Sequence, residues 1–156
     1  MVTWQSIRAL FAAPEPDHQP LDIQTAIAIL FLEVASSDDA FVAEERREID
    51  RLLQKRFGLS ADEHVALLAQ AREYRKTHAD VFHATREIAE QFTPEERFAF
   101  LVEVWRVVLA DGVISFEEDS FMRKLVNLLR LDRIAWVQAR DEALKQMETF
   151  KREKKP

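Results

Sequence analysis

Apolar residues recur at helical spacing along most of the chain, and short polar segments separate these stretches. The pattern predicts helices near residues 3–13, 21–36, 42–57, 61–77, 80–91, 94–110, 116–130 and 133–150. Two stretches, around 23–35 and 98–110, are apolar on nearly every face, which is typical of helices at the centre of a bundle. We therefore expect an all-α fold, a compact bundle of about seven or eight helices around two central buried ones.

Capping residues mark the predicted helix boundaries. In a capping box, the hydroxyl of Ser or Thr and the carboxylate of a Glu three residues later each accept a backbone N–H. Such boxes lie at Ser60–Glu63, Thr93–Glu96 and Ser115–Glu118, and Asp80 and Asp132 are further candidate N-caps. Gly58 follows a predicted helix whose last turn is basic, and we expect it to end that helix in the left-handed conformation.

The two central stretches begin two similar segments, residues 26–59 and 99–131, which align at an offset of 73 residues. The second copy is one residue shorter near its end. The alignment pairs Val34 with Val107, Asp38 with Asp111, Glu45 with Glu118, Ile49 with Met122, Leu52 with Leu125 and Leu59 with Leu131. Because two copies are too few for a solenoid, we predict two similar helical hairpins related by a pseudo-two-fold axis.

Composition narrows the function classes. The chain has 156 residues and a net charge of −6, which argues against nucleic acid as a partner. It contains two glycines and no cysteine, which excludes Gly-rich phosphate loops, disulfides and thiolate metal sites. No segment has the length and hydrophobicity of a signal peptide or a membrane span, so the predicted location is the cytoplasm.

The length fits a single domain. We expect the helical domain to cover residues 21–150. Residues 1–20 are expected to form an amphipathic helix and a proline-rich linker, and residues 151–156 a basic tail.

The turn of the second copy carries the clearest candidate chemistry. Its Gly112, a hydrophobic residue two positions later and Glu118 match the second half of a calcium-binding EF-hand loop. The first half fails, because Val107 and Leu109 stand where ligating acids are required, and a full EF-hand is therefore rejected. What remains is the carboxylate pair Asp111 and Glu118.

The first copy repeats this pair as Asp38 and Glu45. Two interpretations stay open. In one, the acids only cap helices and stabilise turns; this accounts for Glu118, but not for Glu45, because Val42 occupies the capping position of the first copy. In the other, the four carboxylates hold a divalent cation or a partner, and oxygen ligands of this kind suit Ca²⁺, Mg²⁺ or Mn²⁺.

A buried helix that ends in Ala-Asp-Gly-x-hydrophobe-x-x-x-Glu, here Ala110 to Glu118, resembles the TerB-like tellurite-resistance family, as does the Phe-Gly-Leu-Ser stop at 57–60. A related motif occurs in the N-terminal domain of DjlA-type co-chaperones. The resemblance covers roughly residues 21–143. It implies a non-enzymatic bacterial stress-response module near membrane-associated complexes, with a metal site at Asp38, Glu45, Asp111 and Glu118 beside Gly112.

Other functions find less support in the residues. The motifs of serine hydrolases, zinc proteases and di-iron bundles are absent, and His78 and His83 are expected to be exposed. The main alternative is an interaction or co-chaperone-like adaptor domain that binds a protein partner without metal. Candidate anchors for such an interface are aromatic: Trp4, Phe11, Phe82, Phe92, Trp136 and Phe150. The sequence leaves the partner and the oligomeric state open.

Overall fold

The computed structural model describes residues 21–35, 43–77 and 82–153, and every regular element in these ranges is an α-helix. The helices are α2 (Ile23–Ala35), α3 (Ala43–Phe57), α4 (Ala61–Thr77), α5 (Phe82–Gln91), α6 (Pro94–Val108), α7 (Phe116–Leu128) and α8 (Arg133–Glu153). The expected all-α bundle is confirmed. The helix predicted at residues 3–13, the linker, Asp38, His78 and Asp80 lie outside the described residues.

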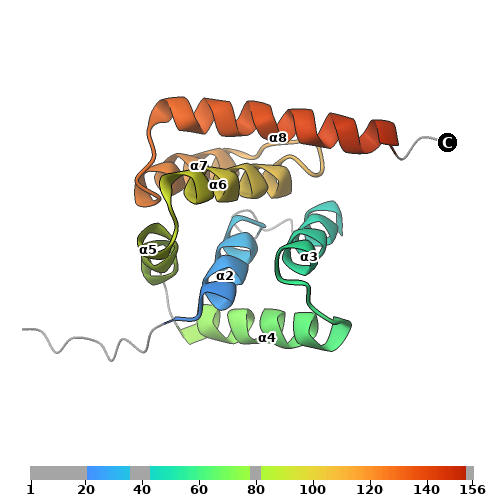
Figure 1. Cartoon of the computed structure of the whole chain (residues 1–156), viewed down its shortest axis with the longest axis vertical. Coiled ribbons are helices and arrows are strands. Elements are labelled where there is room, and N and C mark those ends of the chain that lie inside the picture. Colours follow the sequence, from blue (N-terminus) through green and yellow to red (C-terminus); the bar gives the residue numbers. More distant parts are fainter. Residues whose placement is uncertain (1–20, 36–42, 78–81, 154–156) are drawn as a thin grey trace, which may run out of the picture.

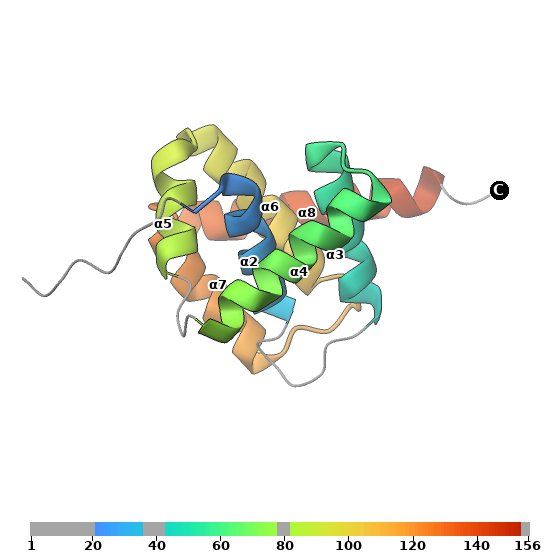
Figure 2. The same cartoon turned by 90° about the horizontal axis from the view of Figure 1, so that it is seen from below.

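The two predicted central helices are the ones that the others surround. Helix α2 contacts α3, α4, α5, α6 and α7, and α6 contacts α2, α3 and α8. Figure 1 shows α8 lying along α6 on one side of α2, with α4 on the opposite side. Seen from below, α2 lies behind α4, with α5 on one side of it and α3 on the other (Figure 2).

Burial explains why α2 and α6 lack a polar face. Nearly every residue of α2 is buried, including Phe31, and α6 buries Phe100, Leu101 and Trp105 completely. The rings of Phe31 and Phe100 are 5.6 Å apart at their centroids and join the two helices. Trp105 meets the ring of Trp136 on α8 edge-on at 5.2 Å. Such aromatic pairs add to the hydrophobic stabilisation of the core.

The predicted caps form as expected. Glu63 accepts the Ser60 N–H at 2.9 Å, and Ser60 Oγ accepts the Glu63 N–H at 3.2 Å. Thr93 and Glu96 make the same pair of bonds, at 2.8 and 3.2 Å, before α6. Asp132 caps α8 by accepting the Ala135 N–H at 2.8 Å. Gly58 ends α3 with φ 59°, as predicted.

The end of α7 shows a feature that the sequence did not predict. Arg130 has φ 57°, a left-handed conformation that the achiral glycine adopts easily and L-residues adopt at a cost. The Leu131 N–H donates to Val126 O and the Arg130 N–H to Asn127 O, both at 3.0 Å, which is a Schellman motif. Arg130 therefore has the role in the second segment that Gly58 has in the first.

Four helix ends in the described ranges differ from the prediction. Helix α2 begins at Ile23 rather than at 21, and α7 ends at Leu128 rather than at 130. Helix α6 ends at Val108 rather than at 110, because the Asp111–Gly112 turn begins there. Helix α8 continues past 150 to Glu153, so Lys151 and Arg152 belong to its last turn rather than to a tail. Basic side chains interact favourably with the negative end of the helix dipole, which explains why the helix continues.

Candidate functional site

The acidic turn between α6 and α7 is built by local hydrogen bonds. Gly112 has φ 80°, which lets the chain reverse after α6. The side chain of Asp111 accepts the Val113 N–H at 3.0 Å through Oδ1. This bond fixes the turn and occupies one carboxylate oxygen of the first predicted ligand.

Glu118 lies in the first turn of α7 and completes the predicted capping box. Its Oε1 accepts the Ser115 N–H at 3.2 Å, and Ser115 Oγ accepts the Glu118 N–H at 3.0 Å. The side chain is buried, with 2% of its surface exposed. Capping therefore accounts for the position of one oxygen of this carboxylate.

Glu45 occupies the corresponding place in the first turn of α3 and is 1% exposed. No hydroxyl residue precedes it at the capping position, which Val42 occupies in the sequence. Asp38, the fourth predicted ligand, lies outside the described residues. Within residues 21–35, 43–77 and 82–153, no group of three or more acids or histidines is arranged to hold a metal ion.

Paired positions of the two similar segments have matching exposure. Val34 and Val107 are both buried, as are Ile49 and Met122, Leu52 and Leu125, and Glu45 and Glu118, whereas Glu44 and Glu117 are both exposed. The match agrees with the alignment, and the pseudo-two-fold repeat itself stays a prediction.

Beside the acidic turn, three large apolar side chains point away from the core. Val113 is 66% exposed, Ile114 40% and Phe116 82%. Sequence reasoning missed them, because Val113 and Ile114 lie in a turn, where helical periodicity assigns no inward or outward face, and Phe116 is the first residue of α7, where the pattern only begins. Exposed apolar residues that gather in one place are typical of interaction sites.

The aromatic residues proposed as anchors have mixed positions. Phe92 and Trp136 are partly buried against the core, and Phe150 is partly buried beneath the guanidinium of Arg51, 5.4 Å from its ring centroid. Phe82, at the start of α5, is 57% exposed. Trp4 and Phe11 are not among the residues that the structure describes.

A charged groove lies between α3 and α8, with α6 as its floor. Arg106 extends from the buried helix α6 and is only 8% exposed. Its Nε is 3.0 Å from Oε1 of Glu48 on α3, and its Nη1 donates to Oε1 of Gln146 on α8 at 3.1 Å. Arg51 donates to both oxygens of the same Glu48, at 3.1 and 2.6 Å. One carboxylate therefore serves two guanidinium groups.

Burial shifts the pKa values of two charged side chains in the groove. Desolvation lowers the pKa of Arg106, with Glu48 opposing and Arg51 reinforcing the shift. At the other end of the groove, Arg56 binds Glu103 through Nε at 3.0 Å and Nη2 at 2.7 Å. Burial nevertheless raises the pKa of Glu103 above its ordinary value, and the ion pair with Arg56 offsets only part of this shift.

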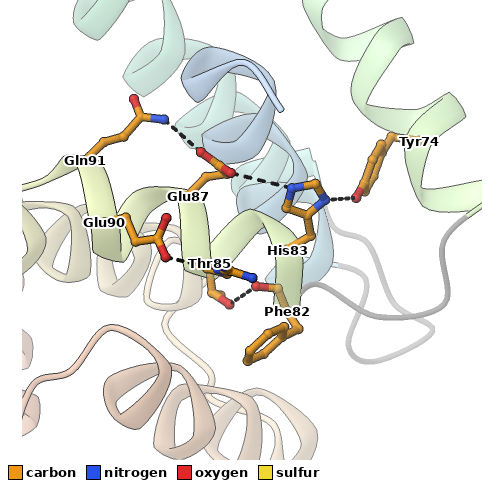
Figure 3. A network of polar contacts seen from close by, with 8 residues as sticks. Tyr74, Phe82, His83, Thr85, Glu87, Glu90 and Gln91 are labelled. Atoms are coloured by element: carbon orange, nitrogen blue, oxygen red, sulfur yellow. Dashed lines mark hydrogen bonds and ion pairs between the residues drawn. The ribbon is translucent and has the colours of Figure 1, made fainter. Parts of the chain in front are cut away.

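Two histidines make polar side-chain contacts. His64 is buried, and its Nε2 lies 2.8 Å from Oδ1 of Asp50 on α3. His83 was expected to be exposed, and this is wrong: it is half-buried between α4 and α5 (Figure 3). Its Nδ1 contacts Tyr74 Oη at 3.3 Å and its Nε2 lies 3.5 Å from Glu87. The i, i+4 spacing to Glu87 was the available signal.

None of the described helices is long and apolar enough to cross a membrane. No curated protein and no solved structure matches the chain significantly. The model of the family described as "Tellurite resistance protein TerB" matches residues 24–141, which include both acidic turns and all helices from α2 to the middle of α8. The match covers most of the chain and agrees with the motif at residues 110–118. The chain therefore belongs to the TerB family of tellurite-resistance proteins.

Proposed function

We propose that this protein is a non-enzymatic accessory module of bacterial tellurite resistance and stress response that binds a divalent cation through its two acidic turns. The ligands would be Asp38 and Glu45 from the first turn, and Asp111 and Glu118 from the second. The module would work in the cytoplasm, next to a membrane-associated complex that it contacts as a protein partner.

The observation that carries this proposal is the burial of two equivalent carboxylates. Glu45 is 1% exposed and Glu118 2% exposed, each in the first turn of its helix. Glu118 belongs to a capping box, whereas no capping hydroxyl precedes Glu45 in the sequence, so the feature that the two copies share is a buried acid at an equivalent position. A cation bound at each turn would give both acids one role.

The ligand set defines the class of cation. Carboxylate oxygens suit hard divalent ions, and the part of the chain described contributes no histidine to either turn. Ca²⁺ accepts a flexible arrangement of six to eight oxygens, whereas Mg²⁺ demands an octahedron and keeps several waters. Ca²⁺, Mg²⁺ and Mn²⁺ are therefore the ions to test.

Thermal unfolding with and without each ion tests the proposal. An ion at about 100 times its Kd stabilises the folded state by about 2.7 kcal/mol, which for a chain of this size raises Tm by about 5–10 °C. The double variant Asp111→Asn, Glu118→Gln should lose this shift. Glu63→Gln combined with Asp132→Asn is the matched control, since it changes a capping-box Glu and an N-cap Asp away from the turns, and it should keep the shift.

Two results would contradict cation binding: no Tm shift at millimolar ion, or an equal shift in the Asp111, Glu118 double variant. The first result would leave the second candidate function, an interaction or co-chaperone-like adaptor domain without metal. That function is favoured by the exposure of Val113 and Phe116 beside the turn, and by the backbone N–H groups that Asp111 and Glu118 already accept.

A further inference from the structure

The α6–α7 loop, taken together with the first two residues of α7 as residues 109–117, combines exposed apolar side chains with negative charge. Residues 109–117 contain two acids, Asp111 and Glu117, and no basic residue. Phe116 is 82% exposed and Val113 66% exposed, and Glu117 beside Phe116 is exposed as well. A surface of this kind fits a partner that is basic and partly apolar.

The groove between α3 and α8 has the opposite charge and an apolar wall. One part of it, a hollow of about 560 Å³, is lined by four basic residues, Arg47, Arg51, Arg106 and Lys151, and by two acids, Glu44 and Glu48. This excess of positive charge lies on a chain whose net charge is −6. Met147 and Phe150 on α8 form the apolar wall.

The groove keeps an excess of basic residues over acids around its ion pairs. Arg51 and Arg106 both pair with the carboxylate of Glu48, and the charge of Arg51 disfavours the protonated form of Arg106, which Glu48 and Glu103 favour. A second carboxylate that enters from outside would reduce this repulsion in a partly dehydrated hollow, where charge interactions are stronger than in water. The groove therefore fits an acidic segment that also carries apolar side chains.

The loop and the groove are neighbours on one face of the protein. Ala110 lines the hollow, and the loop leaves α6 from this residue. Figure 2 shows the loop starting at the end of α6 that lies nearest α3. Complementary surfaces side by side on one molecule can meet twice across a two-fold axis, the commonest symmetry of protein dimers.

We infer that the chain forms a dimer in which the α6–α7 loop of each copy docks in the α3–α8 groove of the other. Phe116 and Val113 would pack against Met147 and Phe150, and Glu117 would face Arg47. In this dimer a second copy of the chain binds the loop, whereas the adaptor function assigns that contact to a different protein. The dimer requires no cation.

Sedimentation equilibrium of the full chain, up to millimolar concentration, tests this dimer. The wild type should have twice the monomer mass, and added salt should weaken the association. Phe116→Ser should weaken it by about 30-fold or more, since it removes a central aromatic anchor. Glu117→Lys and Arg47→Glu should each weaken it by about fivefold, and the double variant should recover most of the loss.

Two controls separate docking from loss of folding. Glu95 is exposed at the second position of α6, as Glu117 is at the second position of α7, so Glu95→Lys is matched in helix position and charge. Val65 is 66% exposed on α4, and Val65→Ser is therefore the control for Phe116→Ser. Neither control should change the dimer, and all variants should keep the helical circular dichroism spectrum.

A wild type that is monomeric at every concentration would overturn the dimer, as would a dimer that Phe116→Ser and Glu117→Lys leave unchanged. Recovery in the Arg47→Glu, Glu117→Lys double variant would establish the contact between the two side chains. Failure of the dimer is distinguishable from failure of cation binding, because the ion-dependent Tm shift of a monomer would remain.

Discussion

Arg130 offers a sharp test of the backbone argument, because its φ of 57° is the only positive value at a non-glycine position in the described ranges. We predict that Arg130→Gly stabilises the protein. The left-handed conformation costs an L-residue about 1–2 kcal/mol. Glycine removes this cost, but its freedom in the unfolded chain takes back about 0.5–1 kcal/mol. Loss of the exposed Arg charge at a helix C-terminus removes a few tenths more.

The net gain expected for Arg130→Gly is about 0.5 kcal/mol, or about 1–2 °C in Tm for a chain of this size. Gly58→Ala should have the opposite sign. A Cβ added at Gly58 would meet no atom within 4 Å, so its effect isolates the conformational cost at φ 59°. We expect Gly58→Ala to destabilise the protein by about 0.5–1 kcal/mol.

Urea unfolding followed by circular dichroism measures both changes as shifts in midpoint at constant slope. Arg130→Ala is the control for side-chain charge, since it removes the guanidinium and keeps the strained Cβ. If Arg130→Gly were no more stable than Arg130→Ala, the strain assigned to this position would be refuted.

Two further predictions concern the capping box and the groove. Ser115→Ala and Thr93→Ala should each lower the free energy of unfolding by about 1 kcal/mol, because each hydroxyl accepts one N–H in an equivalent capping box. Thermal unfolding measures both losses, and unequal losses would contradict equal capping roles. Because burial raises the pKa of Glu103, the folded state binds its proton more tightly than the unfolded state does. Its contribution to stability should therefore fall as pH rises from about 4.5 through the raised pKa, and Glu103→Gln should remove this fall in a pH series of urea unfolding. Identical pH profiles of stability for Glu103→Gln and the wild type would contradict this role of Glu103.

Local sequence signals predicted the secondary structure because they act within a few residues of each other. The capping boxes at Ser60, Thr93 and Ser115 each need one hydroxyl and one Glu three residues apart, and all three form. Gly58 and Gly112 both take the left-handed conformation that their positions required.

The candidate site was predicted only in part. The sequence placed Glu45 and Glu118 at equivalent helix starts, and both are buried. It could not show that Asp111 accepts the Val113 N–H, or that Phe116 points outward, since side-chain directions in a turn, and at the first position of the helix that follows it, depend on the exact backbone path. The buried Arg106 gave no signal, because an Arg within an apolar helix finds its partners only when α3 and α8 pack on either side.

By itself, the sequence determined the helices, their caps, the two central elements and the TerB motif, because each depends on periodicity or short spacing. The tertiary structure decided which charged side chains from distant helices pair with one another. Glu48, Arg51, Arg106 and Gln146 lie on three helices, and one carboxylate serves two guanidiniums only after these helices pack. It also decided that Arg130 adopts a left-handed conformation, since the contacts of α7 and α8 fix where the chain must turn.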